Sequence, residues 1–227
     1  MQGGRQSPPA CQPAPGVVPV MEALPHLAAD GVMPLWLAHH YGVPLRFGYR
    51  GTRDLLPTVH SRRAVRVPYV AWSQAEASLG PRALRHGLAL SVARLVLGGE
   101  PSEWESLAVR SGRRTPKGKE WARRKGRDGY LKGVPRPDGE WWAPGVYGDP
   151  LAVEVDTGKL PLWDVRERWK KWRLYSGVVW VVLSPHRAEA VGRLLDDWLR
   201  DKPGYVGRWR VLWLKAWWEG GEYAWVR

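Results

Sequence analysis

The chain has 227 residues, with 35 lysines and arginines against 22 aspartates and glutamates, and its formal net charge at pH 7 is +13. A charge of this sign and size is typical of proteins that bind nucleic acid. The single cysteine, Cys11, excludes a disulfide framework and a cysteine-based zinc site within one chain. There is no apolar run of about 18 residues and no hydrophobic signal core near the start, so we expect a cytoplasmic protein without membrane contact.

Tryptophan occurs 16 times and phenylalanine once, while isoleucine and asparagine are absent. This bias indicates GC-rich coding, and the absence of asparagine suits a thermophile. Tryptophan is therefore expected to serve mainly as the large core residue of this protein, before any individual ring is interpreted as a platform for stacking bases.

The N-terminal region begins with residues 1–16, which are rich in Pro, Gly and Gln and are expected to be a disordered lead. Beyond the lead, apolar spacing predicts three short helices. Pro34 falls in the first turn of the second helix, where a missing N–H does no harm. These helices are expected over residues 17–30, 33–41 and 49–59.

Two short strands, hinged near Pro68, are expected over residues 63–72. Three helices followed by a strand pair is the order of a winged helix-turn-helix, so residues 17–80 are predicted to form a DNA-binding domain that ends at Gly80-Pro81. The third helix would bring Arg50 and Arg53 near the major groove. The arginines expected on the wing or its approach are Arg62, Arg63 and Arg66.

The next segment combines a helix with a highly charged stretch. Leucine and valine at helical spacing predict a helix over residues 82–97, and a second helix is expected from Ser102 to Val109. Residues 110–136 hold eleven lysines or arginines against two acids, a net charge of +9. We interpret this insertion as a phosphate-tracking loop or arm, although a merely solvated charge run remains open. Its candidate DNA contacts are Arg113, Arg114, Lys117, Lys119, Arg123, Arg124 and Lys125.

The last third of the chain alternates between strands and helices. Ser184 followed by Pro185 is a strong helix start, with the serine as N-cap. Such alternation implies crossover connections and at least partly parallel pairing, and it makes residues 81–227 a single α/β domain. Strands are expected over 151–156, 178–183 and 208–214, and helices over 162–175 and 185–200.

Acidic residues stand out within this basic chain. Glu154 and Asp156 alternate with valine on one strand, so their side chains would share a face with Cα atoms about 6–7 Å apart. Asp138 on a neighbouring strand would complete a cup of hard oxygen ligands suited to Mg²⁺ or Mn²⁺, and Glu105 on a helix beside the sheet is a possible fourth acid. In the alternative interpretation these are ordinary exposed acids, with Asp138 in a Pro-Asp-Gly turn.

Pro137-Asp138 together with Glu154-x-Asp156 resembles the PD-(D/E)xK restriction-endonuclease-like superfamily. Over roughly residues 20 to 185, the order of features is more specifically similar to the replication-relaxation family of plasmid and mobile-element proteins. The resemblance implies an α/β (α+β) fold, in which a winged helix-turn-helix precedes a nuclease-like mixed sheet flanked by helices. It also implies a role in replication initiation or DNA relaxation.

The chain departs from the superfamily pattern at Asp156, where active nucleases typically carry lysine. Lys159, or Lys170 and Lys171 on the following helix, would have to reach the site instead. His86 would line the site as a proton carrier or backbone contact, or serve only as a histidine packed between helix and sheet.

Three classes of function follow from these features. The first is a plasmid- or nucleoid-associated protein that binds double-stranded DNA and either cuts it with Mg²⁺ or acts as a catalytically inactive regulator, with a homodimer or a replication protein as further partner. The second is a structural or packaging protein, and the third is an RNA-directed nuclease.

Overall fold

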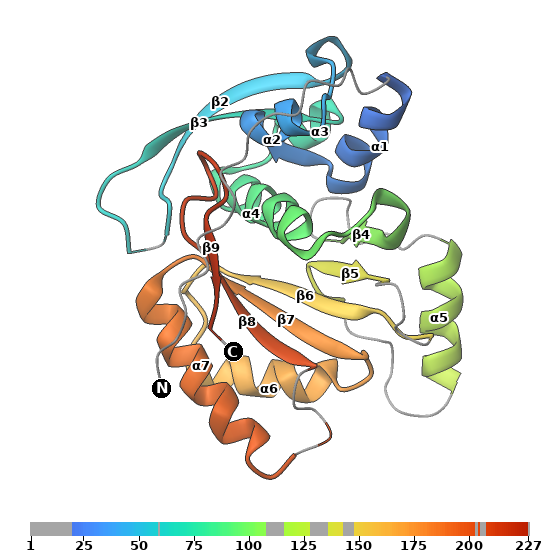
Figure 1. The fold of residues 1–227 in the computed structure, drawn as a ribbon, viewed down its shortest axis with the longest axis vertical. Coiled ribbons are helices and arrows are strands. Elements are labelled where there is room, and N and C mark those ends of the chain that lie inside the picture. Colours follow the sequence, from blue (N-terminus) through green and yellow to red (C-terminus); the bar gives the residue numbers. More distant parts are fainter. Residues whose placement is uncertain are drawn as a thin grey trace.

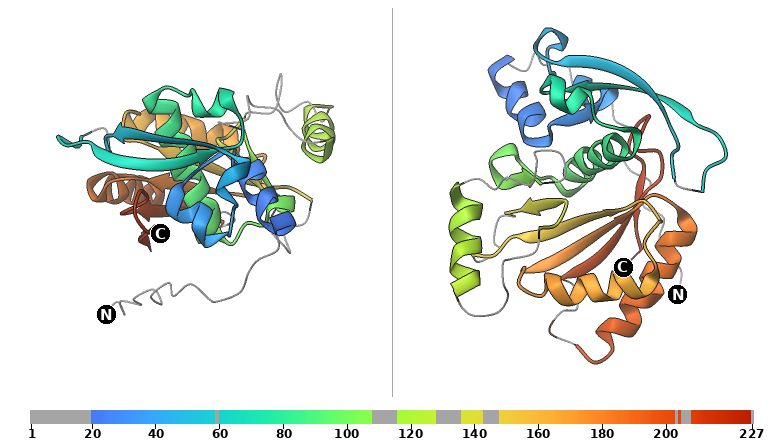
Figure 2. Two further views of the ribbon diagram at one scale, coloured as in Figure 1. Left: turned by 90° about the horizontal axis from the view of Figure 1, so that it is seen from above. Right: turned by 180° about the vertical axis from the view of Figure 1, so that it is seen from behind.

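The computed structural model describes residues 20–58, 60–107, 116–127, 136–142, 148–202, 204 and 208–226. It is a mixed α/β protein with two sheets (Figure 1). The small sheet has three strands in the order β1-β3-β2, and the large sheet has six in the order β4-β5-β6-β7-β8-β9. Helix α4 lies between the two sheets, and α6 and α7 cover the opposite face of the large sheet (Figures 1 and 2). Among the described residues, no helix has the length and apolar content needed to cross a bilayer.

The N-terminal elements form the small-sheet module. The helix expected from residue 17 is described from Val20, and the start of the second expected helix is instead a strand. The module consists of α1 (Val20–Asp30), β1 (Val32–Pro34), α2 (Leu35–His40), the 3₁₀ turn η1 (Leu45–Phe47), β2 (Tyr49–Leu55), β3 (Val65–Ala71) and α3 (Gln74–Ala77).

The third helix, predicted over residues 49–59, is wrong, because this segment forms strand β2. All seven of its residues pair with β3 in an antiparallel ladder. A Cβ at Gly51 would lie 2.4 Å from the ring of Tyr69, so glycine is what lets that ring cross β2. The two strands expected around Pro68 are one strand, and β1 pairs only with Tyr69 to Ala71, so Pro68 has a neighbouring strand on one side alone.

Helix α4 (Pro81–Leu97) confirms the strongest helix prediction and ends at Gly98, whose φ of 69° is the left-handed conformation that favours glycine. The helix predicted from Ser102 is wrong. The chain there forms the short 3₁₀ turn η2 (Pro101–Glu103) and then strand β4 (Trp104–Ser106), which pairs with β5 (Gly139–Trp141). The basic insertion contains a helix, α5 (Pro116–Arg127).

The predicted alternation of strands and helices in the last third is confirmed. Strands β6, β7 and β8 are parallel to one another, and the short antiparallel strand β9 at the sheet edge was not foreseen. The elements are β6 (Leu151–Asp156), α6 (Leu162–Trp172), β7 (Gly177–Val182), α7 (Pro185–Leu199), β8 (Trp209–Leu214) and β9 (Tyr223–Trp225).

The large sheet separates two hydrophobic cores. Val153 and Val155 of β6 pack into the core that contains α4 and the small-sheet module, whereas Ala152 packs into the core under α6 and α7. Glu154 and Asp156 alternate with those valines and therefore share the face of Ala152. Eight tryptophans are buried, which supports their expected role in the core, and they are Trp104, Trp121, Trp169, Trp172, Trp180, Trp198, Trp209 and Trp217.

The connection between β8 and β9 joins the small-sheet module to the large sheet. The indole N–H of Trp217 donates to the carbonyl of Pro57, and the indole N–H of Trp36 donates to the carbonyl of Trp217, both at 3.2 Å. Trp217 itself is fully buried. These two hydrogen bonds and the burial of Trp217 fix the module against the rest of the protein.

Candidate functional site

Two carboxylates meet where β5 begins and β6 ends. The antiparallel ladder between these strands pairs Gly139 with Val153, and its next step brings Asp138 opposite Glu154. Their side chains are hydrogen-bonded to each other, which requires a shared proton. The predicted convergence of Asp138 and Glu154 is therefore present in the structure, and we call these two residues with Asp156 the acid centre.

His86 on α4 lies beside Asp138. Its Nε2 atom lies 2.6 Å from Asp138 Oδ2, and the N–H of Val155 donates to the same oxygen at 2.7 Å. Burial pushes the pKa of Asp138 upward, but the close His86 ring and the hydrogen bonds from Glu154 and Val155 outweigh it and lower the pKa below its ordinary value. Asp138 is thus held as the ionised member of the pair.

Glu154 carries the opposite shift. Burial first, and the negative charge of Asp138 second, raise the pKa of Glu154 well above its ordinary value, while Arg168 acts in the other direction. Arg168 extends from α6 with its Nη1 atom 3.8 Å from Glu154 Oε2, a distance at which it relieves only part of the repulsion. Glu154 is therefore the protonated member of the pair, and the line of contacts runs from His86 through Asp138 and Glu154 to Arg168.

Asp156 faces α7 and the following loop. It accepts hydrogen bonds from the Arg187 guanidinium, with the shortest contact 2.6 Å, and from the Trp180 indole at 3.1 Å. The N–H of Gly158 also donates to it at 2.7 Å. At position 156, where the nuclease pattern typically has lysine, this chain has an aspartate that is hydrogen-bonded to the largely buried Arg187.

The remaining predicted site residues lie on β4, on the loop after β6 and on α6. Glu105 is on β4 rather than on a helix and is paired in register with Glu140, whose Oε1 accepts the Tyr175 hydroxyl at 2.7 Å. Lys159 is exposed on the loop after β6. On α6, Lys170 donates to Glu167 at 2.6 Å and Lys171 is exposed. The cations that contact the acids are His86, Arg168 and Arg187.

The fit of a divalent cation to this centre is incomplete. Within the described part of the chain, no group of three or more His, Cys, Asp or Glu side chains is arranged to hold a metal ion. Two carboxylates, Asp138 and Glu154, converge as such an ion requires, but the third expected ligand, Asp156, is held by Arg187. The cup of three carboxylates predicted from the sequence is not assembled in this conformation.

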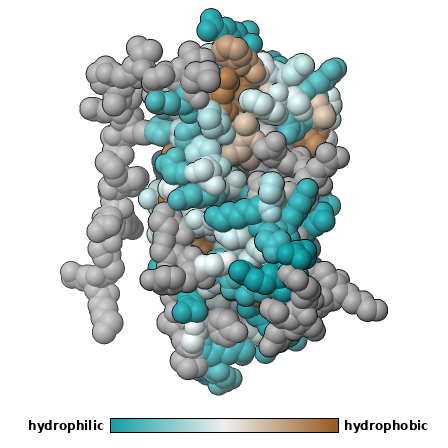
Figure 3. All heavy atoms as spheres, turned by 90° about the vertical axis from the view of Figure 1, so that its right-hand side faces the viewer, coloured by the Kyte–Doolittle hydropathy of each residue, from teal (hydrophilic) through white to brown (hydrophobic). Residues whose placement is uncertain are grey.

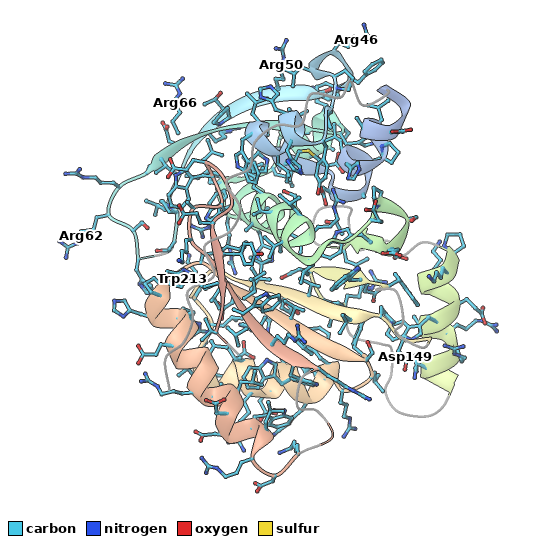
Figure 4. All side chains as sticks on the ribbon, in the orientation of Figure 1. Arg46, Arg50, Arg62, Arg66, Asp149 and Trp213 are labelled. Atoms are coloured by element: carbon cyan, nitrogen blue, oxygen red, sulfur yellow. The ribbon has the colours of Figure 1, made fainter. Side chains whose placement is uncertain are left out.

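The predicted DNA-binding arginines of the N-terminal region are exposed on the β2–β3 hairpin. Arg50 and Arg66 stand on the same face of the hairpin, because Arg50 is four residues, an even number, from Asp54, the register partner of Arg66. Arg53 lies on the other face, and Arg62 and Arg63 lie toward the tip. Figure 4 shows Arg46, Arg50 and Arg66 pointing away from the body of the protein, with Arg62 at the far end of the hairpin.

The predicted DNA-contacting residues of the basic insertion differ in their placement relative to α5. Arg113 and Arg114 lie outside the described residues. Lys117, Lys119, Arg123 and Arg124 are exposed on α5, whereas Lys125 is partly buried and donates to Asp149 at 2.8 Å. The hairpin and α5 thus form two cationic surfaces, both outside the acid centre.

Sequence reasoning missed the two arginines of the acid centre, Arg168 and Arg187. A signal for Arg187 was present, because the third residue of a helix that begins with Ser184-Pro185 lies at the carboxyl end of the parallel strands, where Asp156 also ends its strand. Comparison of the chain with family models, with curated proteins and with solved structures finds no match, so its function is argued from its own geometry.

Proposed function

We propose that this protein binds double-stranded DNA through the β2–β3 hairpin and carries a nuclease-like domain that holds its acids internally and does not cut. In this proposal it acts as a replication or transcription regulator of a plasmid or mobile element. The observation that carries the proposal is the outward face of the hairpin, where Arg50 and Arg66 project into solvent from a fixed antiparallel ladder.

The small-sheet module supports a winged-helix arrangement with a shortened recognition element. Helix, strand, helix, then a strand pair, with the order β1-β3-β2, is the winged-helix connectivity. The recognition helix of such a domain would precede β2, and the chain there has only the three-residue turn η1 (Leu45–Phe47). A turn of that length does not fill a major groove, so the arginine-bearing hairpin becomes the main DNA contact.

The large sheet supports the nuclease-like interpretation. A helix, three antiparallel strands, a crossover helix and a parallel strand follow one another as α4, β4, β5, β6, α6 and β7. Asp138 immediately before β5 and Glu154 on β6 occupy the positions that the resemblance to PD-(D/E)xK nucleases implies. This order of elements and the placement of the two acids support the proposed nuclease-like domain.

The charges around the acids favour binding without cleavage. Each acid already contacts a cation of the protein itself, with His86 on Asp138, Arg168 on Glu154 and Arg187 on Asp156. Lysine is missing at 156, and Lys159 is exposed on its loop. A nuclease needs ionised acids that hold a metal and a cation that orients the attacking water, and these residues are committed to one another instead.

Fluorescence anisotropy with a labelled duplex tests the DNA-binding part of the proposal. Arg50→Glu/Arg66→Glu should weaken binding by about 100-fold or more, because two phosphate contacts become repulsive, and wild-type affinity should fall with a log–log salt slope near −5 if about six phosphates are neutralised. Asp54→Asn removes a negative charge from the same face and should strengthen binding. Arg193→Glu/Arg200→Glu on α7 makes the same charge change at exposed positions and should have little effect. Equal losses for the hairpin and α7 variants would refute a hairpin site.

A metal-dependent nicking enzyme is the second candidate, favoured by the protonated Glu154 beside Asp138. Two acids that repel each other would gain from a divalent cation, which Asp138 and Glu154 would hold and which would activate water. Supercoiled DNA incubated with Mg²⁺ or Mn²⁺ separates the two candidates. The proposal predicts no relaxed or linear product, whereas cleavage that Asp138→Asn and Glu154→Gln abolish, with binding intact, would establish the enzyme.

A further inference from the structure

Helix α5 is fixed to the large-sheet side of the protein by Trp121 and Lys125, which both donate to Asp149. Trp121 is buried, its indole N–H donates to Asp149 Oδ1 at 2.8 Å, and its ring contacts those of Trp142 and Tyr175. Lys125 donates to the second Asp149 oxygen at 2.8 Å. A basic segment that was only solvated would not require such anchoring. The anchoring fixes the orientation of α5, so that the same face of the helix is always exposed to solvent.

The outer side of α5 is cationic. Lys119 and Arg123 are exposed on it, and Arg124 next to them is 57% exposed while its guanidinium reaches the carbonyl of Gly148. Lys117 lies over the ring of Trp142, with Nζ 4.4 Å from the ring centre. Glu120 is the acid of this face and accepts two hydrogen bonds from Arg123. Exposed lysines and arginines on an anchored helix can contact backbone phosphates without reading sequence.

The α5 surface is separate from the hairpin surface. The views in Figures 1 and 2 agree in placing α5 and the hairpin tip on opposite sides of the molecule. Seen from the α5 side, hydrophilic side chains predominate at the height of the helix and apolar ones gather above it (Figure 3).

We propose that α5 is a second phosphate-binding surface that takes a second DNA duplex, so that one molecule bridges two duplexes. This inference rests on the proposed DNA binding of the hairpin and adds a partner to it. Because α5 and the hairpin tip lie on opposite sides of the molecule, a duplex bound at the hairpin tip leaves the α5 surface available. The structure assigns duplex DNA to α5 because the exposed side chains Lys119, Arg123 and Arg124 are charged and can contact backbone phosphates of any sequence.

A bead assay measures bridging directly. Biotinylated duplex on beads is loaded with the full-length protein and then offered a second, fluorescent duplex of unrelated sequence. Lys119→Glu/Arg123→Glu should reduce capture of the second duplex by about 10-fold or more, while affinity for one duplex in solution changes by less than about 3-fold. Arg193→Glu/Arg200→Glu is the matched control, since it also reverses two exposed helical cations, and it should leave capture unchanged.

The outcomes distinguish the two proposals. A wild-type protein that binds no duplex at all refutes the proposed function, whereas one that binds a duplex without capturing a second refutes only the bridging. Capture that survives Lys119→Glu/Arg123→Glu also refutes the role of α5, because two hairpins in a dimer would then hold the two duplexes. Loss of single-duplex affinity equal to that of Arg50→Glu/Arg66→Glu would show one continuous surface and overturn the inference as well.

Discussion

Two buried clusters of charged residues in this protein differ in how their acids are paired. Between α1 and α4, Arg94 donates two hydrogen bonds of 2.8 Å to Asp30, and both side chains are almost completely buried. A further 2.8 Å bond reaches the carbonyl of Gly99, and His26 accepts from the same guanidinium at 3.2 Å. In the acid centre, Asp156 is likewise paired with Arg187, but Asp138 and Glu154 lie side by side with one histidine and a distant arginine.

The two clusters differ in how the charge of each carboxylate is balanced. Burial, then the charge of Arg94 and then His40, lower the pKa of His26 to about 4, so His26 stays neutral and the Arg94–Asp30 pair keeps its balance at physiological pH. The acid centre has no such balance, because Glu154 must hold a proton to remain beside Asp138. Clusters of unbalanced titratable groups are where binding and catalytic sites are found.

The largest effect is expected from Asp30→Ala. It leaves the buried Arg94 without its carboxylate, and breaking a buried pair by removing one partner costs about 3–5 kcal/mol of unfolding free energy. Denaturant unfolding followed by circular dichroism measures the loss. The double variant Asp30→Leu/Arg94→Met removes both charges and should cost less than Asp30→Ala. A single variant as stable as the wild type would show that the two clusters do not differ in the way described.

A smaller loss is expected from Arg187→Met. It removes the cation from Asp156, whose side chain is inaccessible to solvent, but the indole of Trp180 and the N–H of Gly158 still donate to the carboxylate. Leaving a charged group partly satisfied costs about 2–3 kcal/mol. Denaturant unfolding again measures it, and Arg187→Met/Asp156→Asn should recover part of the loss. A double variant that is no more stable than Arg187→Met would show that the pair is not coupled.

Glu154→Gln should stabilise the protein at alkaline pH. Because the fold raises the pKa of Glu154, the stability contributed by its proton is fully present below the ordinary value of 4.5 and is lost as pH rises through the raised pKa. Glutamine keeps a donor toward Asp138 at every pH, so the variant should gain on the order of 1 kcal/mol over the wild type at high pH and nothing near pH 4.

Unfolding at a series of pH values tests that sign. The lowered pKa of Asp138 acts in the reverse sense, since its contribution is present above the ordinary value of 3.8 and disappears as pH falls through the lowered pKa. Asp138→Asn should therefore lose stability at neutral pH and converge with the wild type in acid. A constant offset between Glu154→Gln and the wild type across all pH values would contradict the shared proton.

The strands and helices of the last third were predictable because their signals are local. Leu151 to Asp156 is a run whose alternation of apolar and acidic side chains fixes both a strand and its two faces, and Ser184-Pro185 fixes a helix start. The segment from Tyr49 was not predictable as a strand, because its conformation depends on pairing with β3 and on Tyr69 crossing Gly51. Glu105 moved from a helix to a strand for the same kind of reason, since β4 exists through its pairing with β5.

The acid centre was predictable only in part. The spacing of Glu154 and Asp156 and the nearby Pro137-Asp138 were enough to bring Asp138 and Glu154 together in the prediction. The pairing of each acid with its arginine was not predictable, because Arg168 and Arg187 reach the sheet from two helices whose rotation is set by packing. In the folded protein, each of the acids expected to bind a metal contacts a basic side chain of the protein itself.

The smallest effect on unfolding free energy is expected from Arg193→Ala. This variant tests whether the contact distance of an ion pair or its burial determines how much the pair stabilises the protein. Arg193 lies 2.7 Å from Glu189, which is as close as Arg94 lies to Asp30, yet both of its side chains are about two-thirds exposed, at 68% and 64%. Water screens the exposed pair, so its loss should change unfolding free energy by no more than about 0.5 kcal/mol. If Arg193→Ala costs as much as Asp30→Ala in the same denaturant titration, then contact distance rather than burial sets these energies, and the contrast drawn between the Arg94–Asp30 pair and the acid centre loses its physical basis.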